Sequence, residues 1–319
     1  MKHANIPVFV PHVGCPNDCV FCNQRTISGK TDFRIEKVRE EIEEALKTVV
    51  SCVRQIAFFG GSFTGIERSL MTQLLEIANE YIEKGLADSV RLSTRPDYID
   101  GEILDILEQY KVKSIELGIQ SMNDRVLAMN KRGHTAEASR RAMELISKRG
   151  FGLTGQMMTG MYGSSPEDEV MTAEEICKYA DSARIYPTVT FKDTQLANLY
   201  EKGDYSPPSL EETVERGSAV YRIFKEKGVD VIRIGLQSGE GLHSDKVIAG
   251  EYHDAIGELI LSRVCLDEMR ERRIPVEFSN GTATFSVPKK LLSQYIGQRR
   301  KNVNILEKEL GLKVRIIPI

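Results

Sequence analysis

Short apolar segments alternate with longer segments of helical period along the first 190 residues. The apolar segments are rich in Val, Ile and Phe, and the first five are each followed by apolar residues three or four positions apart. This alternation predicts parallel strands joined by crossover helices, that is, an α/β fold whose six β/α units form a partial (β/α)6 TIM-type barrel. The predicted strands are 6–14, 54–61, 89–96, 114–121, 151–160 and 182–189.

The pattern changes after residue 190. A polar connection with the pair Pro207-Pro208 leads to a predicted helix at 210–227, a strand at 231–237 and a helix at 255–272. We expect these elements to form an α/β extension packed on the barrel. The predicted domains are a barrel at 1–190, the extension at 191–278 and a small C-terminal module at 279–319.

The composition argues against a secreted or membrane protein. The chain has 319 residues, a net charge of -3 and six cysteines, three of them crowded between residues 15 and 22. The other cysteines are scattered, which is not the pattern of a disulfide framework. No segment approaches the roughly 18 apolar residues of a membrane span, and the first residues do not read as a signal peptide. We therefore expect a soluble, cytoplasmic protein with no membrane contact.

Polar and glycine-rich residues follow the predicted strands. The strand ends read GC, GGSFTG, STRPD, IQS and TGMYG. In parallel sheets and barrels the loops at the carboxyl ends of the strands carry the functional groups. The sequence therefore predicts a site at this edge.

The most informative stretch is GCPNDCVFC, which contains Cys15, Cys19 and Cys22 and no fourth cysteine nearby. Three thiolates on a short loop after a first strand suit an iron-sulfur cluster with one iron open to an outside ligand. A zinc site completed by His12 is the alternative, although catalytic zinc favours nitrogen and oxygen ligands.

The spacing C-x3-C-x2-C in CPNDCVFC, with Phe21 before the last cysteine, resembles the radical S-adenosylmethionine (SAM) superfamily. Further stretches resemble its Elongator protein 3 class, and the likeness runs over about residues 6–260. They are GGSF at 60–63, STRPDYI at 93–99, ELGIQS at 116–121, NKRGHT at 130–135 and RIYPTV at 184–189.

This resemblance implies a 4Fe-4S cluster held by Cys15, Cys19 and Cys22, with SAM on the fourth iron. It also implies a low-potential electron donor such as ferredoxin or flavodoxin. The SAM contacts that it implies are the turn Gly60, Gly61 and Ser62, then Arg95 near the methionyl end, and Gln120 and Ser121 near the ribose. Ser62 replaces the usual glutamate, and the chain is too short for the acetyltransferase domain of Elongator protein 3 itself.

The C-terminal residues are strongly basic. Between Phe285 and Ile319 there are eight Lys or Arg residues against two Glu. The order strand, short helix, glycine turn, amphipathic helix and strand over 282–319 resembles a KH nucleic-acid-binding module, whose GxxG loop clamps a single strand. Here Arg300 replaces the second glycine. The residues expected to contact RNA are Gly297, Arg299, Arg300 and Lys301. The alternative is a packing module with a solvated charged face.

These observations predict a radical SAM enzyme that acts on RNA, plausibly tRNA. One alternative keeps the radical chemistry on a small molecule, such as a porphyrinogen or a free modified nucleobase. The other is a non-catalytic nucleic-acid-binding protein with a structural metal. The sequence identifies neither the substrate nor a catalytic residue that handles its radical.

Overall fold

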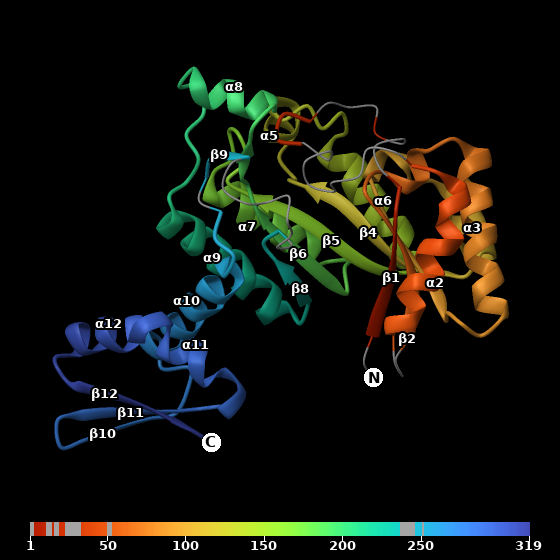
Figure 1. Cartoon of the computed structure of the whole chain (residues 1–319). Coiled ribbons are helices and arrows are strands. Elements are labelled where there is room, and N and C mark those ends of the chain that lie inside the picture. The colour runs from red at the N-terminus through yellow and green to blue at the C-terminus, as the bar shows by residue number, and fades with distance from the viewer. Residues whose placement is uncertain are drawn as a thin grey trace.

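The computed structural model describes residues 3–10, 15, 19–22, 33–49, 53–236, 246–250 and 252–319. Cys52, His12 and part of the predicted cysteine loop lie outside these residues. Figure 1 shows two parts, a large α/β body and a smaller C-terminal module below it. No helix in the described part of the chain combines the length and the apolar character needed to span a bilayer.

Seven parallel strands form the curled sheet of the body in the described chain, in the order β1-β2-β3-β4-β5-β6-β8. The first six follow one another along the chain, as expected for successive β/α units, and confirm the partial barrel. The strands are β1 (His3–Phe9), β2 (Val53–Phe59), β3 (Ser89–Thr94), β4 (Val112–Gln120), β5 (Gly152–Thr159), β6 (Ser182–Pro187) and β8 (Asp230–Ile234).

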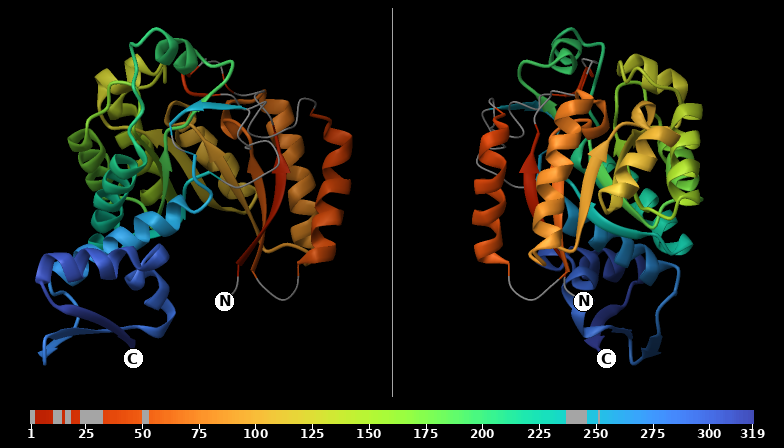
Figure 2. Two further views of the ribbon diagram at one scale, coloured as in Figure 1. Left: turned by 60° about the vertical axis from the view of Figure 1, so that its left-hand side comes forward. Right: turned by 90° about the vertical axis from the view of Figure 1, so that its right-hand side faces the viewer.

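Helices cover one face of this sheet (Figures 1 and 2). Their apolar stripes pack on alternate strand residues, so that Ile56, Leu92, Leu117 and Ile185 are fully buried in one continuous core. The elements between the strands are η1 (Ile35–Lys37), α2 (Val38–Thr48), η2 (Phe63–Gly65), α3 (Arg68–Glu83), η3 (Pro96–Tyr98), α4 (Gly101–Gln109), α5 (Asp124–Met129), α6 (Ala136–Lys148) and α7 (Pro166–Ile176).

The extension completes the sheet rather than only packing on it. Helix α9 (Leu210–Lys227) begins at a capping box of Ser209 and Glu212 and ends at Gly228, which has a φ of 73°. Strand β8 then pairs with β6. The preceding connection contains β7 (Thr190–Phe191) and α8 (Gln195–Glu201), and β7 pairs with β9 (Val247–Ala249).

The C-terminal module has its own core. A three-stranded sheet in the order β10-β11-β12 carries Ala283, Phe285 and Val314 against three helices. Helix α10 contributes Cys265 and Met269 to this core, so its second half packs with the module. The elements are α10 (Ile256–Arg270), β10 (Val276–Ser279), β11 (Thr282–Val287), η4 (Lys289–Leu291), α11 (Leu292–Ile296), η5 (Gln298–Arg300), α12 (Lys301–Leu310) and β12 (Lys313–Pro318). The domain limits given above stay a prediction.

Candidate functional site

The cysteine loop follows β1 and is tied to two distant segments. The Cys22 amide donates to the carbonyl of Cys19 at 2.9 Å, which closes a turn. The Val20 amide donates to the Asn130 carbonyl at 3.3 Å, and the Val20 carbonyl accepts from the Leu196 amide at 2.7 Å. The loop after β4 and the start of α8 therefore hold the backbone between the second and third cysteines.

An apolar cluster strengthens this attachment. Val20 is buried against Leu196 and Tyr205 of the extension, with Phe21 and Tyr162 beside them. The Tyr162 and Tyr205 rings meet edge to face at 6.0 Å. The Tyr205 hydroxyl donates to the carbonyl of Gly160, at the end of β5, at 2.8 Å. The extension thus helps to set the position of the cysteine loop.

The surroundings of the thiols suit thiolate ligands. Cys15, Cys19 and Cys22 are all free of disulfides. The Cys15 thiol contacts Ser62 Oγ at 3.8 Å, and Arg132 Nη1 donates to Cys19 Sγ at 3.4 Å. In the described part of the chain no three Cys, His or carboxylate side chains converge closely enough to hold a metal ion, so the ligand role of the three cysteines stays a prediction.

The turn after β2 requires glycine. Gly60 has a φ of +105°, and a Cβ there would lie 3.2 Å from the Phe9 ring and 3.3 Å from the Val10 carbonyl oxygen. Gly61 follows it, and the next residue, Ser62, is buried beside Cys15. Backbone of this kind can approach a ligand closely, as the predicted SAM contact requires.

The end of β4 supplies an unsatisfied polar group. The chain irregularity between Gly118 and Gln120 breaks the strand register, and Gln120 has a φ of 67°. Its side chain lies over Gly118, where a Cβ would meet Gln120 Nε2 at 3.3 Å. Gln120 Oε1 is buried and has no hydrogen-bond partner among the described residues. A bound ligand with a donor group would satisfy this oxygen. The Ser121 hydroxyl, by contrast, accepts from the Asn123 amide at 3.2 Å.

Arg95 lies near the cysteines but is held by protein groups. Its Nε and Nη2 donate to the Asp97 carboxylate at 2.9 Å each, and Nη2 also donates to the Arg132 carbonyl. Burial opposes the charged form, but Asp97 and the charges of Cys19 and Cys15 raise the pKa of the guanidinium. These contacts fix the loop after β4 beside the cysteines, and the predicted contact of Arg95 with SAM stays a prediction.

Two further residues near the cysteines, Arg132 and His134, carry no predicted ligand contact. Arg132 reaches Cys19 and also donates to the Gly118 carbonyl at 2.6 Å. His134 is buried, and burial followed by the charge of Arg132 lowers its pKa from 6.5 to about 4. Its Nε2 has no hydrogen-bond partner in the described part of the chain. Their position in NKRGHT, after β4, was the signal available in the sequence.

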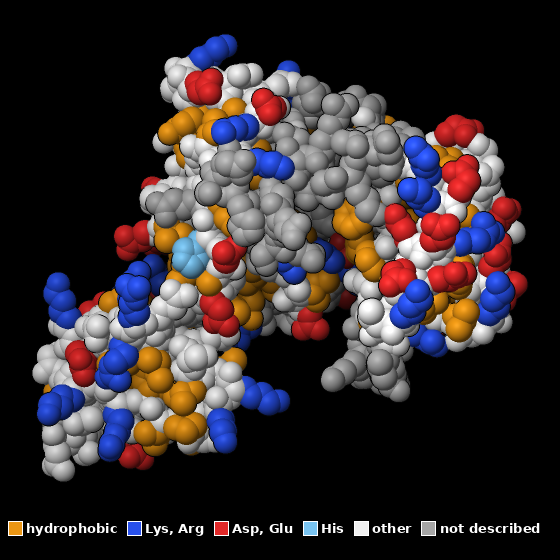
Figure 3. Space-filling model, viewed as in Figure 1, with side chains coloured by type: hydrophobic (Ala, Val, Ile, Leu, Met, Phe, Trp, Pro, Cys, Tyr) orange, Lys and Arg blue, Asp and Glu red, His pale blue; other side chains and the backbone are white. Residues whose placement is uncertain are grey.

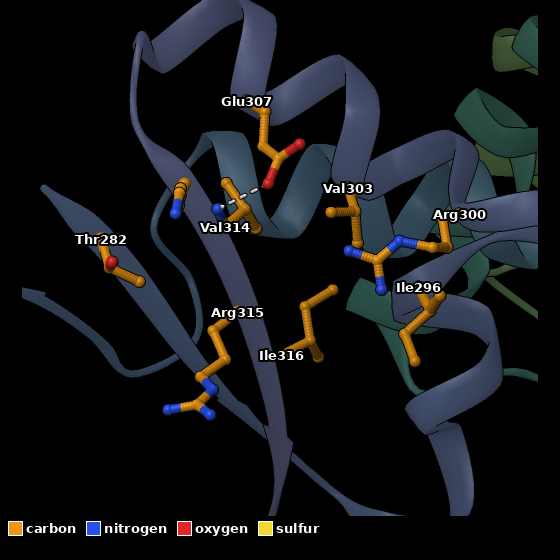
Figure 4. A pocket seen from close by; sticks show the side chains of 9 residues that line it. Thr282, Ile296, Arg300, Val303, Glu307, Val314, Arg315 and Ile316 are labelled. Atoms are coloured by element: carbon orange, nitrogen blue, oxygen red, sulfur yellow. Dashed lines mark hydrogen bonds between the residues drawn. The ribbon is translucent and has the colours of Figure 1, made fainter.

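The C-terminal module contains a groove of about 490 Å³ between α12 and β12 (Figure 4). Apolar side chains from Ile296, Val303 and Ile316 form its floor, and arginines lie at its margins. At the other end of the groove, Glu307 Oε1 accepts a hydrogen bond from the Val314 amide at 3.0 Å. The lining residues are Thr282, Ile296, Arg300, Val303, Glu307, Lys313, Val314, Arg315 and Ile316.

The loop beside the groove is strained. Gly297 has a φ of 75°, and both Arg299 and Arg300 adopt the left-handed region with φ of 50° and 61°. Left-handed backbone is costly for residues other than glycine. The next segment is anchored because Asn302 Nδ2 donates to Ser262 carbonyl and hydroxyl oxygens at 2.8 and 3.0 Å. The loop thus places Arg300 at the edge of the groove, with Arg299 next to it in the chain.

The basic side chains after Phe285 make no ion pairs with the part of the chain that the structure describes. None of the eight Lys and Arg residues after Phe285 forms an ion pair within the described residues, whereas Glu309 pairs with Arg270 at 2.6 Å. Figure 3 shows apolar side chains on the module surrounded by Lys and Arg. The surface therefore carries a net positive charge around an apolar patch, which suits a polyanion.

Comparisons with known proteins agree with this geometry. Residues 9–176 match the Radical SAM superfamily and residues 180–265 match the Radical_SAM C-terminal domain. An uncharacterized protein of Methanocaldococcus jannaschii is 29% identical over 64% of this chain and 66% of its own length. The tRNA uridine(34) acetyltransferase of Methanocaldococcus infernus is 26% identical over 50% of this chain and 34% of its own length.

The solved structure of the archaeal Methanocaldococcus infernus Elp3, with an N-terminal deletion, has the same fold. Its TM-score is 0.63 at 21% identity, covering 85% of this chain and 63% of that one. This chain therefore spans between about a third and two thirds of the length of these relatives. The chain belongs to the radical SAM superfamily and is an enzyme whose cofactors are a 4Fe-4S cluster and S-adenosylmethionine.

Proposed function

We propose that this radical SAM enzyme acts on RNA and that its C-terminal module holds the RNA. The observation that carries the proposal is the set of eight basic residues without ion pairs in the described chain, of which Arg300, Lys313 and Arg315 line a groove with an apolar floor. Arg299, Arg300 and Lys301 are the proposed phosphate contacts, and the floor is the proposed position of a base. Single-stranded nucleic acid is bound by such a combination of positive charge and apolar contact.

Within the body, Cys15, Cys19 and Cys22 are the proposed cluster ligands. A cluster held by these three thiolates would supply the electron for reductive cleavage of SAM, the chemistry general to the superfamily. Arg132 donates to the Cys19 sulfur and so orients it, and the Gly60 turn allows the backbone to approach the methionyl group. Buried Gln120 Oε1 accepts a hydrogen bond from SAM, in keeping with its lack of a partner among the described residues.

The relatives support tRNA as the class of RNA. One of them is the tRNA uridine(34) acetyltransferase. The aligned region is half of this chain and about a third of that enzyme. Acetyl transfer is not part of the proposal, because the resemblance on which it draws covers the radical SAM part. We also propose a low-potential electron donor of the ferredoxin or flavodoxin type and a cytoplasmic location.

RNA binding at increasing salt tests this proposal. Replacing two phosphate contacts, as in Arg299→Glu/Arg300→Glu, should weaken binding and reduce the slope of log affinity against log salt by about 1.4, that is, 0.7 per contact. The matched control is Lys84→Glu/Lys113→Glu, which reverses two exposed charges on the body. If both double variants lost RNA affinity equally, the C-terminal module would have no special role in binding.

A further inference from the structure

The open face of the curled sheet, opposite the helices, carries a buried ionic cluster. Glu116 of β4 is fully buried, and its Oε1 accepts from Arg91 Nε at 2.6 Å and from Arg184 Nη2 at 2.7 Å. Its Oε2 accepts from Gln156 Nε2 at 2.9 Å. One carboxylate thus serves two guanidinium groups, which come from β3 and β6.

The positive charge of this face exceeds its negative charge. Arg91 and Glu116 balance each other, so Arg184 is left as a surplus cation. Arg184 also faces Arg233 in the register of β6 and β8. Like charges on directly paired residues repel. Within the described residues Arg233 forms no ion pair, and its Nε donates only to the Gly235 carbonyl at 3.3 Å. Arg184 therefore shares a single carboxylate with Arg91, and its neighbour Arg233 has no carboxylate partner among the described residues.

Arg184 also has an unused donor. Its Nη1 donates to Tyr186 Oη at 3.2 Å, but its Nε is buried without a partner among the described residues. Although burial opposes the charged form, Tyr186 and Glu116 raise the pKa of the guanidinium, so it stays charged. A buried charged donor without an acceptor is costly, and an anionic oxygen would relieve the cost. Its side chain is 18% exposed, so a ligand can reach it.

The arginines lie on the same face as the proposed SAM contact. Gly118 pairs with Gln156, and Gln156 pairs with Arg184, so these residues form one row across three strands. The side chain of Gln120 lies over Gly118. Two strand spacings separate Gly118 from Arg184, which is about 10 Å. A substrate whose reacting carbon lies near SAM and whose oxyanion lies at Arg184 would span this distance.

We propose that Arg184 and Arg233, with Tyr186, form a subsite that binds an oxyanion of the substrate. The proposed source is a phosphate of the target nucleotide, and in this respect the inference rests on the proposed function. The RNA-binding loop holds the strand outside the body, whereas this subsite would position the nucleotide that reacts.

Anion-dependent thermal unfolding tests the subsite without requiring turnover. The variants are Arg184→Gln/Arg233→Gln, which keeps hydrogen-bonding capacity, and Arg299→Gln/Arg300→Gln as a matched control for anions bound at the C-terminal loop. Each protein, with its cluster reconstituted, is unfolded in sodium phosphate, sodium acetate and sodium chloride at equal ionic strength. The quantity compared is the shift relative to chloride within each variant, because phosphate also stabilises proteins generally by exclusion from their surface.

At tenfold its dissociation constant, phosphate should raise the folded-to-unfolded ratio about 11-fold in the wild type and in the loop control. This specific gain should disappear in Arg184→Gln/Arg233→Gln. A larger gain in acetate would keep the subsite but assign it to a carboxylate substrate, which contradicts the nucleotide source. An equal gain in all three proteins, or none in the wild type, would overturn the subsite itself. The salt-dependent RNA measurement described above reports separately on the proposed function.

Discussion

Replacing the strained residue Arg300 by glycine should have opposite effects on the stability of the protein and on its RNA binding. Arg300 has a left-handed backbone, for which a residue with a Cβ pays about 1–2 kcal/mol. Glycine removes this cost but loses about 0.5–1 kcal/mol through the greater freedom of its unfolded chain. The backbone amide of residue 300 donates a hydrogen bond to the Gly297 carbonyl at 3.0 Å, and glycine keeps this bond. Arg300→Gly should therefore stabilise the protein by about 0.5–1 kcal/mol.

The same substitution should weaken RNA binding. Removal of one phosphate contact should reduce the slope of log affinity against log salt by about 0.7. The control is Arg300→Ala, which loses the same charge but keeps the left-handed strain. Urea unfolding and RNA titration of the three proteins separate the two effects. If Arg300→Gly and Arg300→Ala were equally stable, the strain would not be real; if Arg300→Gly bound RNA like the wild type, Arg300 would not contact phosphate.

Three further predictions concern the body. Gly60→Ala should destabilise the protein by about 1–3 kcal/mol, because its φ of +105° strains any other residue, and should lower SAM affinity in equilibrium dialysis; an unchanged affinity would contradict the close backbone approach. Burial keeps His134 neutral in the folded protein, where its pKa is about 4, against roughly 6.5 in the unfolded chain. The unfolded chain therefore binds a proton more readily, and the free energy of unfolding, which is highest above pH 6.5, should fall by roughly 3 kcal/mol as the pH falls to 4 and below. His134→Gln should flatten this part of the stability curve measured by urea unfolding, and an unaltered slope would assign the pH dependence to other groups. Tyr205→Phe removes the hydrogen bond to Gly160, and should cost about 1 kcal/mol and reduce iron retained per chain after reconstitution, whereas full retention would argue that the extension does not position the cysteine loop.

The body could be predicted well from the sequence because its signals are local. Runs such as IAFF in β2 and SIELGIQ in β4 are apolar on the helix-facing side, and the pair Gly60-Gly61 marks the end of β2. The strand near 231–237 was predicted, but its place in the sheet was not. The sequence of a single strand does not identify the strand with which it pairs. The pairing of β8 with β6 depends on how the α9 crossover packs.

The arrangement of the site was harder to predict because it depends on contacts between distant residues. Arg132 reaches Cys19 across 113 positions, and nothing in the local pattern reports this approach. Glu116 lies between Ile115 and Leu117 in β4, where nothing local identifies its two arginine partners from β3 and β6. The strained backbone at Arg299 was also not predicted, since the pattern suggested only a loop that had lost a glycine.

The central claim is that the cysteine triplet supports radical chemistry on an RNA held by the C-terminal module. The most direct test is 5′-deoxyadenosine formation after anaerobic reconstitution with iron and sulfide, with dithionite, SAM and a pool of tRNA lacking modifications. We predict that tRNA increases product formation in the wild type, that Arg299→Glu/Arg300→Glu abolishes the increase, and that Cys15→Ala/Cys19→Ala/Cys22→Ala gives no product. A fully loaded wild-type protein that forms the same amount of 5′-deoxyadenosine with and without tRNA would contradict the account.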